Sequence, residues 1–373
     1  MKNFYKALVL FGVLSLSILF TVSCKQKVDE QHIVIPAILP LTGPSADLGQ
    51  SVANGMRLAV EDLNKEYPQY KFELSIDDSK GQPKEAVTIF NALMTKTKSP
   101  VVLSWMSSAA NALYPLAESN KRILFVGAAM PDLTKGKEHV IRVFPNGVDL
   151  ADKMASYAIT KYKTCSVLYV NDDYGTTIKD VFKDNFEKGG GTIKLIEPLK
   201  LGETDFRTII LKVKKNQPDV IYIPAYGPIY VHIFQQIREI LPNIPIIADI
   251  PLFNSYTLEQ IGKVANGIVG PATLVDDETI KIPEAEVFIK RYKSKYNKRA
   301  DFNGGLGYDM FKIAAVGVMN AKDDGTTVIN YIKNQKNFKG VTGDILIDSN
   351  GDSKIQLELM QIKNGWPMRV TGN

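Results

Sequence analysis

Two adjacent serines, Ser107 and Ser108, follow the apolar run Pro100–Leu103 in the stretch SWMSSAA. The run predicts a buried strand, and the small residues after it favour the start of a helix. Hydroxyl groups and the unpaired N–H groups at a helix start can hold a small anion such as a carboxylate. Capping of the helix by a serine is the purely structural alternative. Trp105 comes just before the serines, and it either walls a pocket or fills the core.

Residue patterns of known catalytic sites are missing from the chain. It has three histidines, none of which has a partner at metal-ligand spacing: His32, His139 and His232. There is no H-E-x-x-H pair, no G-x-S-x-G nucleophile turn and no phosphate-binding glycine loop. The acid pairs Asp172–Asp173 and Asp276–Asp277 fall in predicted loops, where solvated side chains are the simpler interpretation. We therefore expect neither an enzyme nor a metal or cofactor site.

Short apolar runs alternate with amphipathic segments in the first part of the chain. The expected strands are Ile33–Leu39, Lys71–Ile76, Val101–Leu103 and Ile123–Gly127. Between them, apolar residues at helical spacing predict helices over Gly49–Asn64, Lys84–Met94 and Ala109–Ser119. This order of strands and helices is typical of a parallel sheet that is covered on both faces.

The same alternation then repeats. Strands are expected over Ser166–Val170, Thr192–Ile196, Val220–Ile223 and Ile244–Ala248. Helices are expected over Asp149–Tyr162, Gly175–Lys188, Phe206–Lys215, Tyr230–Leu241, Glu284–Tyr296 and Leu306–Asn320, and a hairpin turn over Asp348–Asp352, where Asn-Gly can supply positive φ angles. The sequence thus predicts an α/β protein with two doubly wound parallel-sheet lobes. Ligands bind outside the carboxyl ends of such strands, so the cleft between the lobes is the expected site.

The amino terminus has the layout of a secretory leader. Lys2 and Lys6 precede the apolar stretch Ala7–Val22, and Cys24 follows the small residue Ser23. We interpret residues 1–23 as a signal peptide, Cys24 as a lipidated first residue and residues 24–31 as a tether. A plain signal peptide or an uncleaved anchor is the alternative. The protein is therefore expected outside the cytoplasm, periplasmic or at the cell surface, and held to a membrane through Cys24.

Charge and cysteine content exclude other classes of protein. The formal net charge of the 373 residues is +5, and it falls to about +3 without Lys2 and Lys6 of the leader. No long basic run is present, so nucleic acid is not an expected partner. Cys165 is the one cysteine besides Cys24, and its apolar surroundings indicate a small buried residue.

Several segments resemble one known family. They are IPAILPLTGPSADLGQSVANGMRLAVEDLN, DDSKGQPKEAV, SSAANALYPLAE, AAMPDLT, NDDYG and the stretch from ETDF to DVIYIPAY. In this order and spacing they are similar to the type I periplasmic substrate-binding proteins of ABC importers, in the leucine/isoleucine/valine-binding (branched-chain amino acid) family. The resemblance extends over Ile33–Val370.

The resemblance implies a three-stranded hinge, with crossings near Pro145, Leu274 and Lys354. Lobe one would then comprise residues 32–145 and 275–353, and lobe two residues 146–274 and 354–373. It also implies a set of ligand-binding residues: Ser107 and Ser108, Ala128, Ala129 and Met130 on lobe one, with Trp105 beside them, and Tyr174, Tyr226 and Asp249 on lobe two.

Two of these positions carry an open question. Met130 stands where amino-acid binders of the family often have Thr or Ser. Its N–H can still meet a carboxylate oxygen, but the hydroxyl that would help to hold an ammonium is missing. Its side chain fits the core and the pocket equally well. Asp249 is expected to meet a ligand ammonium or the N-terminus of a helix, since a buried carboxylate needs a partner.

The function implied is capture of a small amino acid, or a related carboxylate or amide, in the cleft. The protein, expected as a monomer, would deliver it to an ABC permease with separate ATPase subunits. A ligand sensor of the same fold, feeding a signalling partner, is the alternative. An enzyme and a cell-envelope scaffold are more distant hypotheses.

Overall fold

The structure is a computed structural model that describes residues 31–273, 282–321, 325–335 and 337–370. The predicted leader, Cys24 and most of the tether lie outside these ranges. The last residue of the predicted tether, Gln31, already belongs to the first strand. Within the described ranges, no helix is both long and apolar enough to cross a bilayer.

The first sheet has five parallel strands in the order β2-β1-β3-β4-β5. Their bounds are β1 Gln31–Leu39, β2 Tyr70–Asp78, β3 Val101–Trp105, β4 Ile123–Gly127 and β5 Val140–Arg142. The chain turns from β1 to β2 on one side and then to β3 on the other. This change of direction leaves a crevice at the carboxyl ends of β1 and β3, which is where open α/β sheets bind their ligands. We call the body built on this sheet lobe one.

The second sheet has seven strands in the order β15-β14-β10-β9-β8-β6-β7. The strands β6 to β10 are parallel, and the last two strands of the chain pair antiparallel at one edge. The bounds are β6 Thr164–Val170, β7 Thr192–Leu199, β8 Val220–Ile223, β9 Ile246–Ala248, β10 Val269–Ala272, β14 Glu358–Lys363 and β15 Trp366–Arg369. We call the body built on this sheet lobe two. The predicted doubly wound lobes are thus confirmed.

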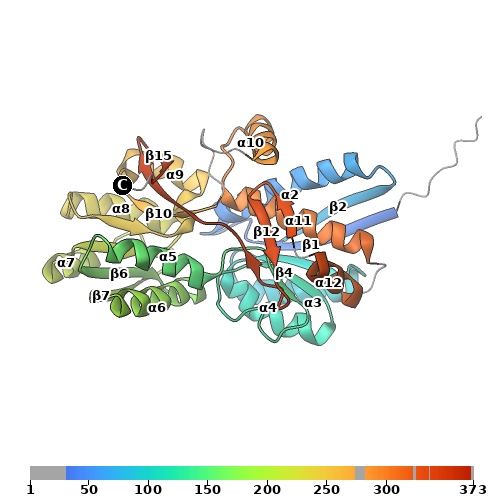
Figure 1. Ribbon diagram of the computed structural model, residues 1–373, viewed down its shortest axis with the longest axis horizontal. Helices are drawn as coiled ribbons and strands as arrows, with labels where there is room; N and C mark the ends of the chain where they lie inside the picture. Colours follow the sequence, from blue (N-terminus) through green and yellow to red (C-terminus); the bar gives the residue numbers. More distant parts are fainter. Residues whose placement is uncertain (1–30, 274–281, 322–324, 336, 371–373) are drawn as a thin grey trace, which may run out of the picture.

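Helices cover both sheets, and Figure 1 shows the two lobes lying end to end. The helices around the first sheet are α2 Ala46–Glu66, α3 Pro83–Lys96, α4 Ser107–Asn120, α10 Pro283–Tyr296, α11 Phe302–Asn320 and α12 Gly325–Gln335. Those of lobe two are α5 Gly147–Ile159, α6 Asp173–Lys188, α7 Arg207–Asn216, α8 Pro228–Ile240 and α9 Ser255–Ile261, with short 3₁₀ turns η1 Ile250–Phe253 and η2 Gly262–Ala265.

Helices α2 and α11 pack at unusually short range. A Cβ atom on Gly55 would lie 1.8 Å from the carbonyl oxygen of Gly304, and one on Gly307 would lie 2.6 Å from that of Val52. Only glycine permits this approach of two backbones. The close contact fixes the start of α11 next to the start of α2, at the edge of lobe one that faces lobe two.

The chain passes between the lobes after β5 and again after β13, where residues 355–357 connect it to β14 (Figure 1). The crossing expected near Leu274 lies outside the described residues. A small antiparallel sheet of β11 Asn337–Gly340, β12 Gly343–Ile347 and β13 Ser353–Lys354 precedes the last crossing. The predicted hairpin at Asp348–Asp352 joins β12 to β13. In its Asn-Gly pair, however, only Gly351 has a positive φ, of 85°, because Asp348 Oδ1 organises the turn by accepting from the N–H groups of Asn350 and Asp352.

Candidate functional site

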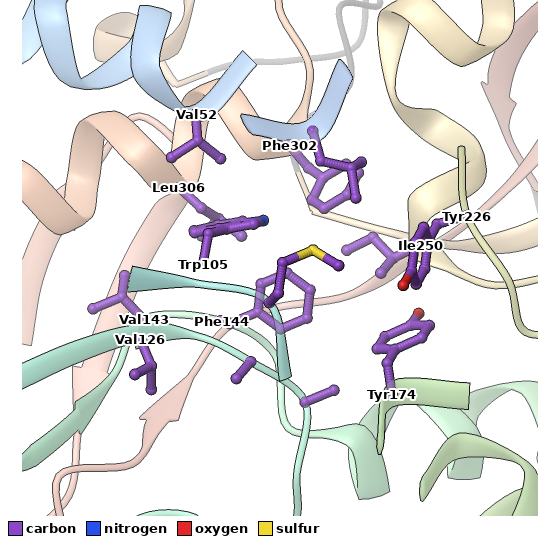
Figure 2. Close-up of a cluster of buried hydrophobic side chains, with 14 of the residues drawn as sticks. Val52, Trp105, Val126, Val143, Phe144, Tyr174, Tyr226, Ile250, Phe302 and Leu306 are labelled. Atoms are coloured by element: carbon purple, nitrogen blue, oxygen red, sulfur yellow. The ribbon is translucent and has the colours of Figure 1, made fainter. Parts of the chain in front are cut away.

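The two lobes meet around a small cavity at the carboxyl ends of β3 and β4. Its volume is about 30 Å³, roughly the space of one water molecule. Aromatic rings supply much of its wall, and Figure 2 shows Trp105, Phe144 and Phe302 together, with Tyr174 and Tyr226 approaching from lobe two. The lining residues are Leu48, Trp105, Met106, Ser107, Gly127, Ala128, Ala129, Phe144, Tyr174, Tyr226, Pro251, Phe302 and Asn303.

Trp105 and Met106 shape the floor of the cavity. The indole of Trp105 packs edge-on against Phe144, with ring centroids 5.6 Å apart, and lies where a Cβ of Gly127 would be. Met106 has a φ of 92°, a conformation that non-glycine residues rarely adopt. The N–H of Met106 donates to the carbonyl of Gly127 at 3.1 Å, which holds the turn in place. Backbone strain of this kind tends to gather at binding sites.

Ser107 is the first residue of α4, but its side chain does not cap the helix. Its Oγ instead accepts from the N–H of Ala129 at 3.1 Å, and the hydroxyl is buried. The capping interpretation is therefore wrong for Ser107, since its hydroxyl joins α4 to the loop after β4. The first N–H groups of α4 have no partner within the helix and lie at this edge of the cavity.

The loop after β4 is held by a buried arginine. Nη1 of Arg142 donates to the carbonyl oxygens of Ala128 at 3.2 Å and Met130 at 2.5 Å, and Nη2 donates to that of Pro131 at 3.0 Å. The same guanidinium makes two hydrogen bonds to the carboxylate of Asp352, at 2.6 and 2.8 Å. Arg142 thus fastens this loop to the hairpin that precedes the last crossing.

This arrangement leaves the N–H of Met130 free. The carbonyl of Ala129 accepts from the N–H of Gly147 at 2.8 Å. Because a trans peptide points its N–H opposite to its carbonyl, the N–H of Met130 is directed away from Gly147. It makes no hydrogen bond within the described part of the chain. The Met130 side chain is half-buried and is not part of the cavity wall.

Two tyrosines of lobe two face the cavity. Tyr174, in the first turn of α6, and Tyr226, after β8, meet edge-to-face with centroids 6.0 Å apart. The hydroxyl of Tyr226 donates to Asp172 Oδ2 at 2.5 Å, while Asp172 Oδ1 caps α6 by accepting from the N–H of Gly175. Burial, with the Asp172 carboxylate beside it, holds the pKa of Tyr226 well above its usual range. Tyr226 is thus fixed as a neutral wall of the cavity.

Asp249 lies behind Tyr174. One carboxylate oxygen, Oδ1, accepts from the N–H of Ile250 at 2.7 Å and so caps η1. The other oxygen, Oδ2, is buried close to the hydroxyls of Tyr174 and Tyr222, which interact with the Asp249 carboxylate, but none of these three atoms makes a hydrogen bond of good geometry within the described residues. Burial raises the pKa of Asp249 to about 6. Burial, and then the nearby Asp249 carboxylate, raises the pKa of each tyrosine well above its usual value.

Carboxylates of lobe one also receive hydrogen bonds from lobe two. Asp301 Oδ2 accepts from the N–H of Ser255 at 2.8 Å and from Asn254 Nδ2 at 3.2 Å, while Asp301 Oδ1 accepts from Ser51. Asp47 Oδ2 accepts from the hydroxyl of Thr257 at 2.8 Å. Burial raises the pKa of both carboxyls. The start of α9 is therefore bound to the starts of α2 and α11.

The structure brings most of the sequence-predicted residues together. Six of them line the cavity: Trp105, Ser107, Ala128, Ala129, Tyr174 and Tyr226. Ser108, Met130 and Asp249 are absent from its wall, although Asp249 is adjacent through Tyr174. The sequence did not single out Met106, Phe144, Pro251, Phe302 or Asn303. The described residues include no group of three or more His, Cys, Asp and Glu side chains that could hold a metal ion.

Comparison with known proteins identifies the family to which the chain belongs. A family model described as periplasmic binding protein matches residues 32–365. The chain belongs to the periplasmic binding protein family. The Leu/Ile/Val-binding protein BraC3 of Rhizobium johnstonii is 28% identical over 328 residues, which cover 86% of this chain and 88% of that protein. The predicted resemblance is thus confirmed.

Solved structures show the same fold. The leucine-binding protein LivK of Thermotoga maritima is 26% identical, with a TM-score of 0.84, covering 91% of this chain and 98% of that one. A solute-binding protein of an ABC transporter from Rhodopseudomonas palustris, in complex with 3,4-dihydroxybenzoic acid, is 20% identical, with a TM-score of 0.83 and coverage of 91% and 96%. Family membership makes this chain an extracytoplasmic binding protein for small molecules, of the kind that serves ABC transporters, and not an enzyme.

Proposed function

We propose that the protein captures a small amino acid, or a related carboxylate or amide, in the cleft between its lobes. The observation that carries this proposal is a pair of unsatisfied polar surfaces on opposite lobes. Lobe one offers N–H groups at the start of α4 and at Met130. Lobe two offers Asp249, whose buried Oδ2 has only the nearby hydroxyls of Tyr174 and Tyr222 beside it and no hydrogen bond of good geometry. A ligand with a carboxylate at one side and an ammonium at the other satisfies both.

Binding in this scheme begins with the lobes apart. The cavity of about 30 Å³ is smaller than an amino acid, so entry requires separation of its walls. The ligand carboxylate docks on lobe one at Ser107, Ala128, Ala129 and Met130. Lobe two then closes with Tyr174, Tyr226 and Asp249. Closure is favoured only because the ligand contacts both lobes, which gives the closed form the higher affinity.

We further propose delivery of the ligand to an ABC permease and attachment to the membrane through a lipid on Cys24. The leader pattern in the sequence and the family's association with ABC transporters support this. A Cys24→Ala variant should leave the membrane fraction of the expressing cells and appear in the soluble fraction. Retention of that variant on the membrane after its leader has been removed would exclude Cys24 as the anchor.

A thermal-shift screen tests the binding function. The panel contains the standard amino acids, their amides, and short aliphatic and aromatic carboxylates, added to the chain from Lys25 onward without lipid. A ligand at 100 times its Kd should raise the free energy of unfolding by about 2.7 kcal/mol, which is easily detected. A shift by at least one α-amino acid supports the proposal. A shift by carboxylates or amides alone would retain the cleft as the binding site but exclude a role of Asp249 in holding an ammonium. The absence of any shift would contradict the proposal.

A further inference from the structure

One wall of the cavity carries two hydrogen-bond donors without acceptors. Asn303, the second residue of α11, is 1% exposed, and its Nδ2 is buried without a hydrogen-bond partner in the described ranges. Trp105 is 3% exposed, and no hydrogen bond of its indole N–H is found there either. Figure 2 shows the indole nitrogen directed toward Phe302, the neighbour of Asn303. Both residues line the cavity.

No hydrogen bond from either donor is formed within the described ranges. Asp301, two residues before Asn303, directs its carboxylate to Ser51, Gly304, Asn254 and Ser255. The other side chains on this wall are those of Leu48, Phe144 and Phe302, which have no acceptor atoms. A buried amide N–H₂ without a partner is costly, and in native proteins it calls for an explanation.

This wall is separate from the part of the cavity that would hold a carboxylate. The carboxylate position is defined by the start of α4 and the loop after β4, which Arg142 holds. Asn303 and Leu48 come from α11 and α2, which pack on each other through Gly55 and Gly307. Asn303 would therefore face the remainder of the ligand.

We infer that Asn303 is a specificity-determining residue that selects a ligand whose side chain carries a hydrogen-bond acceptor. The amide donates to that acceptor, with the indole N–H of Trp105 as a second donor. Because an aliphatic side chain of the same shape would leave the Asn303 amide N–H₂ buried and unpaired, it is discriminated against. The ligand is thus an amino acid with an amide or hydroxyl side chain. This inference rests on the proposed function.

Ligand pairs of matched shape test the inference by calorimetric titration of the purified protein. Asparagine and leucine have nearly the same shape, as do threonine and valine. We expect the polar member of at least one pair to bind at least about tenfold more tightly, the effect of one hydrogen bond to a buried group. Tighter or equal binding of leucine and valine would overturn the inference while leaving the proposed function intact. If none of these four and neither member of the third pair below binds, the inference is overturned, and the proposed function falls with it only if no other compound of the thermal-shift panel binds.

A third ligand pair tests the role of the side-chain acceptor in compounds that have no α-amino group. 4-Hydroxybenzoate and 4-methylbenzoate are carboxylates of similar shape that lack an ammonium. If only this pair binds and the hydroxyl compound is favoured about tenfold, the role of Asn303 stands and the amino-acid part of the proposed function falls. Equal affinity for the two compounds would contradict the role of Asn303 as a specificity-determining residue.

Substitution of Asn303 supplies a second, independent readout. Asn303→Leu keeps the shape and removes the donor, so we expect the preference within each pair to disappear or reverse. Asn320→Leu, at the exposed end of the same helix, is the matched control and should preserve the wild-type ratio. If Asn303→Leu keeps the wild-type ratio of affinities within each ligand pair, the inference is overturned. If this variant does not fold, the comparison of ligand pairs on the wild-type protein still decides.

Discussion

At the scale of single residues, Asp249 carries a buried charge that the described part of the protein only half satisfies. Its Oδ1 accepts from the N–H of Ile250, whereas its Oδ2 has only the nearby hydroxyls of Tyr174 and Tyr222 and no hydrogen bond of good geometry. Burial therefore raises its pKa from 3.8 to about 6. In the unfolded chain the group ionises near its ordinary pKa. Between those two values the folded protein binds more protons than the unfolded chain, so stability falls as the pH rises through this window.

Asp249→Asn should remove this pH dependence. Asparagine can still cap η1, and it carries no charge to be desolvated. The free energy of unfolding at pH 7.5 should rise by about 1–3 kcal/mol, and its decline between roughly pH 4 and pH 6 should become smaller, while the part due to other buried carboxyls such as Asp47 and Asp301 remains. Urea denaturation at several pH values measures both. An unchanged pH dependence would mean that another group is responsible.

The same carboxylate predicts how binding responds to pH. An ammonium ligand needs Asp249 ionised, so its affinity should fall about tenfold between pH 7.5 and pH 5. In Asp249→Asn the affinity should be low and nearly independent of pH over this range. Calorimetric titration with whichever amino acid stabilises the protein makes the comparison. Equal affinity in the wild type at both pH values would show that Asp249 does not meet the ammonium.

The adjacent serines offer a matched pair of variants. Ser107→Ala removes the acceptor of the Ala129 N–H and should weaken ligand binding about tenfold, since the loop after β4 loses its tie to α4. Ser108→Ala changes a half-buried hydroxyl that is not part of the cavity wall, and affinity should stay within about twofold. A larger loss of affinity in Ser108→Ala than in Ser107→Ala would contradict the placement of Ser107, and not Ser108, in the cavity wall.

At the scale of elements, the loop after β4 depends on one arginine and a hairpin far away in the chain. Arg142 on β5 and Asp352 are 210 residues apart and form a two-point ion pair. Three carbonyl groups of the loop rely on the same guanidinium. The planar fork of arginine serves all of these acceptors at once, which a lysine ammonium cannot do.

Arg142→Lys should therefore damage both stability and binding. We expect a loss of about 2–4 kcal/mol in the free energy of unfolding, because buried acceptors lose their donors, together with weaker ligand binding. Arg122→Lys is the control: Arg122 donates to the carbonyls of Lys98 and Ser99 at the rim of lobe one, and its loss should cost less than about 1 kcal/mol. Similar losses in the two variants, measured by urea denaturation, would contradict the special role of Arg142.

The elements that sequence reasoning predicted are those with strong local patterns. The long strands and the amphipathic helices have such patterns, and β4 and β8 begin and end at the predicted residues. Short elements such as β5, β11 and α9 carry too few residues for a period to emerge. Trp105 could be predicted from its place at the end of a strand, whereas Ala128, Tyr174 and Tyr226 were implied by the family resemblance. Each of these three also follows the carboxyl end of a strand, where parallel strands share an edge.

The rest of the site depends on tertiary contacts. Phe144 lies in a crossing segment, and Phe302 and Asn303 open a helix that reaches the cavity only through the glycine contacts of α2 and α11. Arg142 and Asp352 meet only when the chain has crossed between the lobes and returned. No local pattern in the sequence indicates any of these positions.

At the scale of the whole molecule, contact between the lobes is reinforced at the start of α9. Thr257 donates to Asp47 across the cleft, and Ser255 and Asn254 bond to Asp301. These bonds join parts of the two lobes that must separate when a ligand enters. They therefore add to the stability of the closed form independently of the ligand.

Thr257→Val should shift the balance toward the open form. It keeps the shape of the side chain but leaves Asp47 Oδ2 buried without its donor, which favours separation by about 1–2 kcal/mol. The radius of gyration from small-angle X-ray scattering should increase, and ligand affinity should fall by a comparable factor. Thr257→Ser keeps the hydroxyl and should match the wild type. A Thr257→Val protein as compact as the wild type, with full affinity, would exclude this role.

The central claim is that a small carboxylate ligand occupies the cavity between the lobes, and the fluorescence of Trp105 tests it most directly. Trp105 and Trp366 are the two tryptophans of the chain, so Trp366→Phe leaves an emission that comes only from the cavity wall. Titration of this variant with the ligands that stabilise the protein should give a saturable change in emission, with the Kd found by calorimetry. A ligand that stabilises the protein but leaves the Trp105 emission unchanged would bind elsewhere and contradict the account.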